Sequence, residues 1–357
     1  MRKLFAFTLV LALLLAGCGG APAPSGSIPE SSSPGAGPTA QPTAEPVQPV
    51  KIRVAHHAGL SGCIIPGIDS IEGNDFFAQE GLDVEWVKFT SGPPEVAAMV
   101  SGDIQFGYLG HGAHTLAAEG KIEVISLNHL GNSEKIYVRK DSGIVSVEDL
   151  KGKVVATQLG TSGEVILKLA LAKEGMGKDD LKIMNMDMAG AVAAFIAGQV
   201  DAIACWDVHA TNVVEQVGLE NLTLLASTGD FLEETAFPAS WVVTPEYAAE
   251  NEDVVVRFIR ALYRCYDYRA EHYDESIRAA AEFIGAEYET FSKTRDDATN
   301  FTAAQLNEMM SDGSLLNIYQ LQLDYFLKEG QVKEGDAADY VRIDLMEKAY
   351  DSYNAEQ

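Results

Sequence analysis

One pattern of apolar and polar positions occurs twice along the chain, at residues 97–107 and, 96 residues later, at 193–203. Each copy begins with the apolar end of a predicted helix, passes through a glycine, and continues into a short apolar strand. Gly102 and Gly198 suit the position after a helix, because glycine adopts the left-handed conformation without a Cβ clash. The repeat predicts two similar lobes, and the alternative is a chance match between short apolar segments.

The sequence before each copy extends the pattern. It contains a strand, a glycine-containing loop and a second strand, at residues 51–55, 59–62 and 84–89 in the first half and at 153–156, 160–163 and 182–186 in the second. Each half therefore alternates strands with helices, which favours parallel sheets joined by right-handed crossovers. We expect an α/β protein with two lobes, each a mainly parallel sheet flanked by helices, and a cleft between them.

The remaining pattern divides the folded part into three segments. Residues 51–139 are predicted to form the first part of lobe 1, and residues 140–240 to form lobe 2. Residues 241–357 read as a return to lobe 1 that ends in a run of helices. Within lobe 1 we expect a loop over 58–67 and a helix over 69–80.

The start of the chain reads as a targeting segment. A short basic region precedes an apolar run that fits a signal peptide over 1–17 and is short for a membrane span. The small residues before Cys18 resemble the lipobox of bacterial lipoproteins, which implies that Cys18 is lipidated and anchors the protein to a membrane. An ordinary cleaved signal with a chance cysteine is the alternative. Residues 18–50, rich in Pro, Ser, Gly and Ala, are predicted to be a flexible tether.

Charge and cysteine content narrow the function classes. The chain has 52 acidic and 26 basic residues, and this balance argues against binding to nucleic acid. Besides Cys18, three cysteines remain without a zinc-binding spacing, at Cys63, Cys205 and Cys265. We expect three buried thiols, and the alternative is one disulfide with a free thiol. We also expect a monomer that has no cofactor and no metal.

Three predicted helix starts follow strands, at the sheet edge where open α/β folds bind ligands. The N–H groups at a helix start are unpaired and the helix dipole is positive there, so each start could hold an anion, with a dipole contribution of about 0.3–2 kcal/mol. The residues at these starts are Ser91, Gly92, Gly110, His111, Thr161 and Ser162. For any one of them, a capped helix start without a function is the alternative.

Further candidates lie beside these starts. Trp206 would give the cleft a flat apolar wall, and Asp207 would accept a hydrogen bond from a ligand amine. The alternative is a core tryptophan with a helix-capping aspartate. His56 and His57 are neighbours on a strand and point to opposite faces, which makes a poor metal site, and we expect His57 to line the cleft. Glu134 is a weaker acidic candidate.

A run of motifs resembles the solute-binding proteins of the nitrate/sulfonate/taurine family of ABC importers. The motifs stand at residues 101–110, 140–144, 149–155 and 198–202. The resemblance implies a two-lobed periplasmic-binding-protein fold of type II, which holds a small-molecule ligand at the hinge and hands it to a permease and its ATPase. The family's turn after the second-lobe strand carries a proline where this chain has Val208, so the contacts of that turn stay open.

The predicted function is capture of a small organic anion, either an alkanesulfonate or taurine-like compound or nitrate, by closure of the lobes. A pyrimidine precursor or another heteroaromatic nutrient is the alternative ligand. Two other classes compete with transport: a pyrimidine-synthase-like enzyme on the same fold, and a surface lipoprotein without a transport role. The sequence has no serine-nucleophile, zinc-protease or phosphate-loop motif, which is modest evidence against an enzyme.

Overall fold

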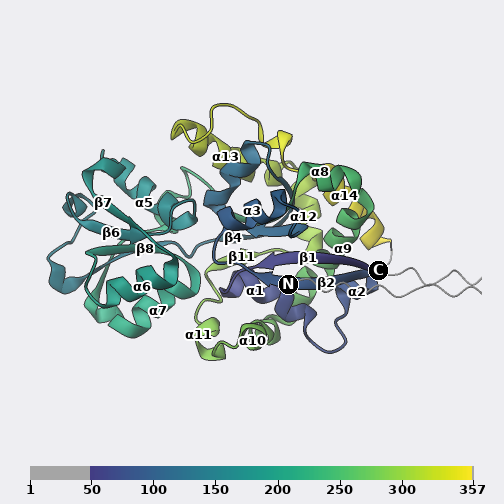
Figure 1. The fold of residues 1–357 in the computed structure, drawn as a ribbon, viewed down its shortest axis with the longest axis horizontal. Helices are drawn as coiled ribbons and strands as arrows, with labels where there is room; N and C mark the ends of the chain where they lie inside the picture. Colours follow the sequence, from purple (N-terminus) through teal and green to yellow (C-terminus); the bar gives the residue numbers. More distant parts are fainter. Residues whose placement is uncertain (1–48, 356–357) are drawn as a thin grey trace, which may run out of the picture. The chain divides into compact units, whose positions relative to one another are not determined.

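The computed structural model describes residues 49–355, whose strands form two separate sheets (Figure 1). The strand order is β11-β4-β10-β3-β1-β2 in the first sheet and β7-β6-β8-β5-β9 in the second. We call the first sheet with the helices packed on it lobe 1, and the second sheet with its helices lobe 2. The predicted signal peptide at 1–17, the lipidation site Cys18 and nearly all of the predicted tether at 18–50 lie outside the described residues.

The strands of lobe 1 are β1 (Val50–His56), β2 (Leu82–Lys88), β3 (Phe106–Leu109), β4 (Glu123–Gly131), β10 (Pro238–Val243) and β11 (Ala298–Asn300). Those of lobe 2 are β5 (Lys135–Arg139), β6 (Val154–Thr157), β7 (Lys182–Asn185), β8 (Ala202–Cys205) and β9 (Leu222–Ser227). The helices up to β9 are α1 (Leu60–Asp69), α2 (Phe76–Gln79), α3 (Gly92–Val100), the 3-10 helix η1 (His111–His114), α4 (Thr115–Ala118), α5 (Ser162–Lys173), α6 (Met188–Ile196) and α7 (Asp207–Val217). The later helices are α8 (Pro245–Glu250), α9 (Glu252–Glu271), α10 (Tyr273–Ile284), α11 (Tyr288–Ser292), α12 (Ala303–Ser311), α13 (Ser314–Lys328) and α14 (Ile343–Asn354).

Most strands of each sheet run in one direction. β1 is parallel to β2 and β3, and β6 is parallel to β7 and β8. The reversed strands are β5 and β10, which border the two crossings between the sheets, and the short β11. The predicted α/β fold class is confirmed, and antiparallel pairs enter where the chain changes sheets. The domain boundaries themselves stay a prediction.

The two sequence repeats take equivalent places in the two sheets. In each, a helix (α3 or α6) ends at a glycine and leads into an inner strand (β3 or β8). Gly102 has φ 82° and Gly198 has φ 69°, the left-handed conformation that the pattern predicted. Figure 1 shows α5 on one face of the second sheet and α6 and α7 on the other, as expected when helices connect parallel strands.

The predicted loop at 58–67 and helix at 69–80 are wrong. The helix is α1, which begins earlier, and only the short α2 follows it before β2. In the sequence the glycines of this stretch look like loop residues, but Gly67 is a site of close packing. A Cβ at Gly67 would lie 2.6 Å from the Cα of Ala280, so the missing side chain lets α1 and α10 approach each other.

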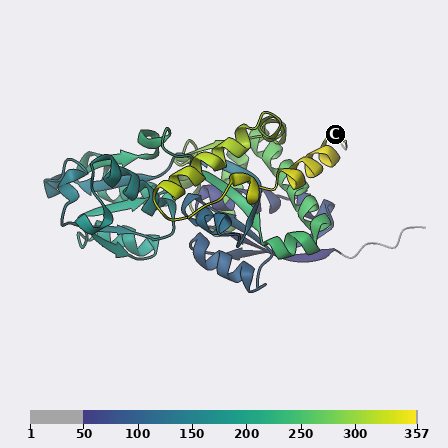
Figure 2. The same cartoon turned by 90° about the horizontal axis from the view of Figure 1, so that it is seen from above.

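The C-terminal helices, green to yellow in Figures 1 and 2, gather around the first sheet. The long α9 packs on β2 and β4, and the ring of its Phe258 stacks on Phe106 of β3 with 4.0 Å between ring centroids. β11 interrupts this helical run and pairs with the end of β4, which the sequence pattern did not predict. Within residues 49–355, no helix is both long and apolar enough to span a membrane.

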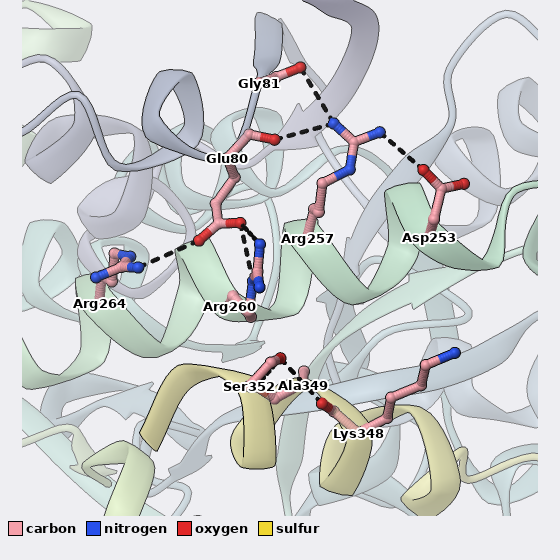
Figure 3. Close-up of polar contacts among 9 residues, drawn as sticks. All are labelled: Glu80, Gly81, Asp253, Arg257, Arg260, Arg264, Lys348, Ala349 and Ser352. Atoms are coloured by element: carbon pink, nitrogen blue, oxygen red, sulfur yellow. Dashed lines mark hydrogen bonds and ion pairs between the residues drawn. The ribbon is translucent and has the colours of Figure 1, made fainter. Parts of the chain in front are cut away.

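An ion-pair cluster ties α9 to the turn that opens β2 (Figure 3). Glu80, whose side chain is 2% exposed, binds Arg260 and Arg264 of α9. Arg257, one turn away, donates to the carbonyl oxygen of Glu80 at 2.9 Å and pairs with Asp253. The cluster fixes the edge strand of lobe 1 against its longest helix.

Candidate functional site

One cavity of about 260 Å³ is lined by residues from both lobes. It lies where β1, β3, β6 and β8 end, so the chain segments that follow these strands form its walls. All nine residues that we predicted to bind a ligand line it: His57, Ser91, Gly92, Gly110, His111, Thr161, Ser162, Trp206 and Asp207. The structure therefore brings the predicted residues together, and their contact with a ligand stays a prediction.

The three predicted helix starts differ in what they offer to a ligand. α5 opens with the free N–H groups of Ser162 and Gly163 behind the extended Thr161, although Glu164 in its first turn already brings a carboxylate. α3 has prolines, which lack an N–H, directly after Gly92, so it offers fewer donors than we expected. The turn at His111 opens only a four-residue 3-10 helix and brings little dipole.

Asp207 reaches from lobe 2 into the start of α1 in lobe 1. Its carboxylate accepts hydrogen bonds from the backbone N–H of Ser61 and of Val208. Gly59 makes room for it, because a Cβ there would lie 2.1 Å from Oδ2 of Asp207. Within residues 49–355, Asp207 is the only residue other than glycine with a positive φ, at 48°, a conformation that costs free energy for most side chains. Asp207 is the first residue of α7, after Trp206 at the N-cap position, and it also lies beside the start of α1. Ligand binding by Asp207 and the capping alternative both stay predictions.

The environment of Asp207 disfavours its charge. The side chain is buried and its Oδ1 has no hydrogen-bond partner among residues 49–355. Burial, and next the nearby charge of Asp297, raises the pKa of Asp207 to about 7. A buried acceptor without a partner, in the wall of a cavity, is a group that a ligand donor could satisfy.

Glu134 is a second buried carboxylate at the cavity, and we had ranked it lower. It lies in the crossing from β4 to β5, and its Oε2 accepts a hydrogen bond from Oγ1 of Thr228 at 2.6 Å. Asp297 lies in the same region and pairs with Lys135 at 3.4 Å. Glu134 lines the cavity, as Asp207 does, whereas Asp297 adds a negative charge nearby that is paired with Lys135. Asp297 was missed because it comes from the loop before β11, far away in the sequence.

His57 lines the other side of the cavity and is held by a buried acid. Its Nε2 lies 2.8 Å from Oε2 of Glu95 in α3, and its ring meets Tyr108 edge-on at 5.3 Å. Glu95 is fully buried, and its Oε1 accepts a hydrogen bond from the backbone N–H of Tyr108. Burial raises the pKa of Glu95, whereas the contact with His57 lowers it. Sequence reasoning missed Glu95, because an acid in a first helical turn is common.

Other histidines and aromatic rings form apolar walls. His111 is buried against Phe237 and Phe326, its Nε2 lies 3.0 Å from Oγ1 of Thr235, and burial lowers its pKa well below the usual range. It is therefore a neutral wall residue rather than part of a positive helix start. Trp206 contacts His209 edge-on at 5.8 Å, and both line the cavity.

The described residues do not suggest a metal or redox site. Within residues 49–355, no group of three or more His, Cys, Asp or Glu side chains could hold a metal ion. Cys63, Cys205 and Cys265 are free and buried, as we expected. Burial raises the pKa of each thiol, so none is an activated nucleophile.

A family model described as NMT1/THI5 like matches residues 72–276, more than half of the chain. The chain belongs to the NMT1/THI5-like family.

Relatives of this NMT1/THI5-like protein carry the names of binding proteins. A protein of Brucella abortus named as a binding protein is 31% identical over 296 residues, which cover 83% of this chain and 91% of the relative. The taurine-binding periplasmic protein of Escherichia coli is 32% identical over 217 residues, or 60% of this chain and 65% of the relative.

A solved structure supports the fold. The crystal structure of the periplasmic aliphatic sulphonate binding protein SsuA from Escherichia coli superposes with a TM-score of 0.64 and 22% identity. The match covers 84% of this chain and 99% of that one. The predicted periplasmic-binding-protein fold of type II is confirmed.

Proposed function

We propose that this NMT1/THI5-like protein is the extracytoplasmic solute-binding component of an ABC importer. It captures a small molecule between its lobes and delivers it to a permease driven by an ATPase. The names of the relatives support binding rather than catalysis. Lipidation at Cys18, with residues 18–50 as a tether, would keep the protein on the outer face of a membrane.

The class of ligand that we propose follows from the surroundings of Asp207. Its buried Oδ1 has no partner among residues 49–355, and a ligand ammonium group would supply one. Glu134 adds a second carboxylate on the same side of the cavity. The N–H groups of Ser162 and Gly163 are the donors left for an acidic group on the same ligand. We therefore propose a small zwitterion, a taurine-like aminosulfonate, in preference to nitrate or a simple alkanesulfonate.

Ligand binding would draw the lobes together. The cavity wall comes from both lobes, so a ligand that contacts both binds the closed arrangement more tightly than an open one. The free-energy difference between its contacts in the two arrangements sets the shift in population. The permease would then recognise the closed form.

An amine-bearing heteroaromatic nutrient is the second candidate. Trp206, Phe89 and Phe237 line the cavity, and flat rings stack on such side chains. The same carboxylates would bind an exocyclic amine on that ring. The cavity volume of about 260 Å³ leaves space for a ligand larger than taurine.

Calorimetric titration of the full-length protein with taurine and with ethanesulfonate tests the proposal. Taurine should bind more tightly, because only taurine carries an amine that can donate a hydrogen bond to Asp207. Asp207→Ala should weaken taurine binding at least tenfold, or about 1.4 kcal/mol, and change ethanesulfonate binding less. The exposed Asp83→Ala is the control and should change neither.

The outcomes separate the parts of the proposal. Equal losses for the two compounds would make Asp207 a structural cap only. If neither compound binds, the sulfonate assignment is wrong, and mass spectrometry of what co-purifies with the protein would test the heteroaromatic candidate.

A further inference from the structure

The pair of His57 and Glu95 has a feature that the proposed function does not use. Glu95 is completely buried under the sheet edge, yet both its carboxylate oxygens have defined partners. Oε1 accepts from the backbone N–H of Tyr108, and Oε2 lies 2.8 Å from Nε2 of His57. A Cβ at Gly107 would lie 2.5 Å from Oε1, so a glycine in β3 makes room for the acid.

The ring of His57 is fixed in place, and one of its two nitrogens has no hydrogen-bond partner among residues 49–355. Tyr108 packs edge-on against the ring, and a Cβ at Gly62 would lie 2.7 Å from the Cβ of His57, so the side chain is confined on both sides. The side chain keeps 21% of its surface exposed and lines the cavity. Nδ1 has no hydrogen-bond partner among residues 49–355, so it is the ring nitrogen available to a ligand.

The number of protons held by His57 and Glu95 together decides whether Nδ1 is a hydrogen-bond donor or an acceptor. Oε1 of Glu95 must be an acceptor, because its partner is a backbone N–H. The shared proton therefore lies between Oε2 and Nε2. If the pair has no net charge, Nδ1 carries a proton whichever partner holds the shared one. Nδ1 is a bare acceptor only if the pair has a net negative charge.

Burial makes the negatively charged pair unfavourable. An uncompensated carboxylate inside a protein costs several kcal/mol, and buried charges are normally paired. Within residues 49–355, the only ion pair of Glu95 is with His57, and Met99 and Val242 lie beside its Oε1 around Gly107. Lys88, the cationic residue of the cavity wall, has an exposed side chain.

We propose that Glu95 is a positioning residue that keeps Nδ1 of His57 protonated, so that the cavity presents a hydrogen-bond donor at this point. The ligand places an acceptor there, such as a sulfonate or carboxylate oxygen. This second step rests on the proposed function, whereas the protonation of Nδ1 belongs to the protein alone. Protonated Nδ1 of His57 would then bind the acidic group of the ligand, and the carboxylate of Asp207 would bind its amine.

Nitrogen-15 NMR of histidine in the full-length, ligand-free protein tests the first step. His57→Asn identifies the signals of His57 among those of the seven histidines. Nδ1 should carry a proton in the wild-type protein. In Glu95→Gln the amide oxygen would take the place of Oε1 and accept from Tyr108, so the amide N–H would donate to Nε2 and Nδ1 would keep its proton. Glu95→Leu removes the acid altogether, so the ring of His57 should become neutral with its one proton no longer confined to Nδ1. Glu164→Gln, also in a first helical turn but bonded to Gly160 and Lys168, should leave the signals unchanged.

A bare Nδ1 in the wild-type protein would overturn the inference, and this measurement needs no variant that might unfold. An Nδ1 that stays fully protonated in a folded Glu95→Leu protein would remove the role of Glu95. Calorimetry tests the second step: Glu95→Leu should weaken taurine binding at least tenfold and leave the binding of ethanolamine, which lacks the acid, within threefold. Equal losses would make Glu95 structural only. If taurine does not bind the wild-type protein, the ligand class fails while the NMR result still decides the protonation.

Discussion

At the residue scale, the charge of Asp207 makes its own contribution to the pH dependence of stability. Burial, and then Asp297, raises its pKa from 3.8 to about 7. Because the folded-state pKa lies above that of the unfolded chain, the folded protein binds this proton more tightly. The stabilisation is complete below about pH 4 and is lost as the pH rises through 7. A shift of this size corresponds to about 4 kcal/mol.

Asp207→Asn removes the titration while keeping an oxygen that accepts from Ser61. Relative to the wild-type protein, the variant should therefore gain free energy of unfolding between pH 5 and pH 8, by up to about 4 kcal/mol. Urea unfolding of the ligand-free protein at several pH values measures the difference. The exposed Asp83→Asn is the control. A difference that is constant with pH would contradict the assignment.

At the scale of elements, the Glu80 cluster makes a specific contribution to stability. Replacement of Glu80, which is 2% exposed, by alanine removes the buried carboxylate that Arg260 and Arg264 bind (Figure 3). Breaking a buried pair in this way costs about 3–5 kcal/mol, and partial exposure of the arginines places the effect at the lower end.

Asp253→Ala on the same helix is the matched control. Asp253 pairs with Arg257 but is 78% exposed, so its loss should cost no more than about 1 kcal/mol. Urea unfolding of both variants measures the contrast. Equal effects would mean that the cluster acts as surface charges rather than as a buried anchor between α9 and β2.

The elements that the sequence predicted are those with a long or repeated pattern. The end of α3 with Gly102 and β3, and the end of α6 with Gly198 and β8, could be found because one pattern occurs twice. β11 could not, because a three-residue edge strand has no period and forms by pairing with β4. α1 was missed because Gly67 serves contact with α10, and a close-packing glycine looks like a loop glycine in the sequence.

The site was predictable in its position but not in its chemistry. Strand ends and helix starts placed the lining residues around one cavity. Which groups stay unpaired depends on contacts between distant segments, such as Asp207 with Ser61 and Glu134 with Thr228. For this reason the sequence left an alkanesulfonate, a taurine-like compound and nitrate open, whereas the unpaired Oδ1 of Asp207 in the folded cavity favours a ligand that carries an amine.

At the scale of the whole molecule, function depends on how closely the lobes meet. η1 of lobe 1 packs on the start of α5 in lobe 2, where a Cβ at Gly112 would lie 2.6 Å from the carbonyl carbon of Thr161. A second contact joins Lys293 after α11 to Glu215 of α7. The first is a backbone contact that cannot relax by a rotamer change, whereas the second is a surface ion pair worth at most about 1 kcal/mol.

Gly112→Ala should therefore act as a wedge between the lobes. The added methyl group cannot fit against the backbone of Thr161, so an arrangement with the lobes further apart becomes favoured. Small-angle X-ray scattering of the ligand-free protein should give a larger radius of gyration for this variant. Gly110→Ala in the same turn is the matched control, because a Cβ there meets nothing within 4 Å. If both variants keep the wild-type radius while remaining folded, the contact of η1 with α5 does not govern closure, and closure must be controlled at the crossings between β4 and β5 and between β9 and β10.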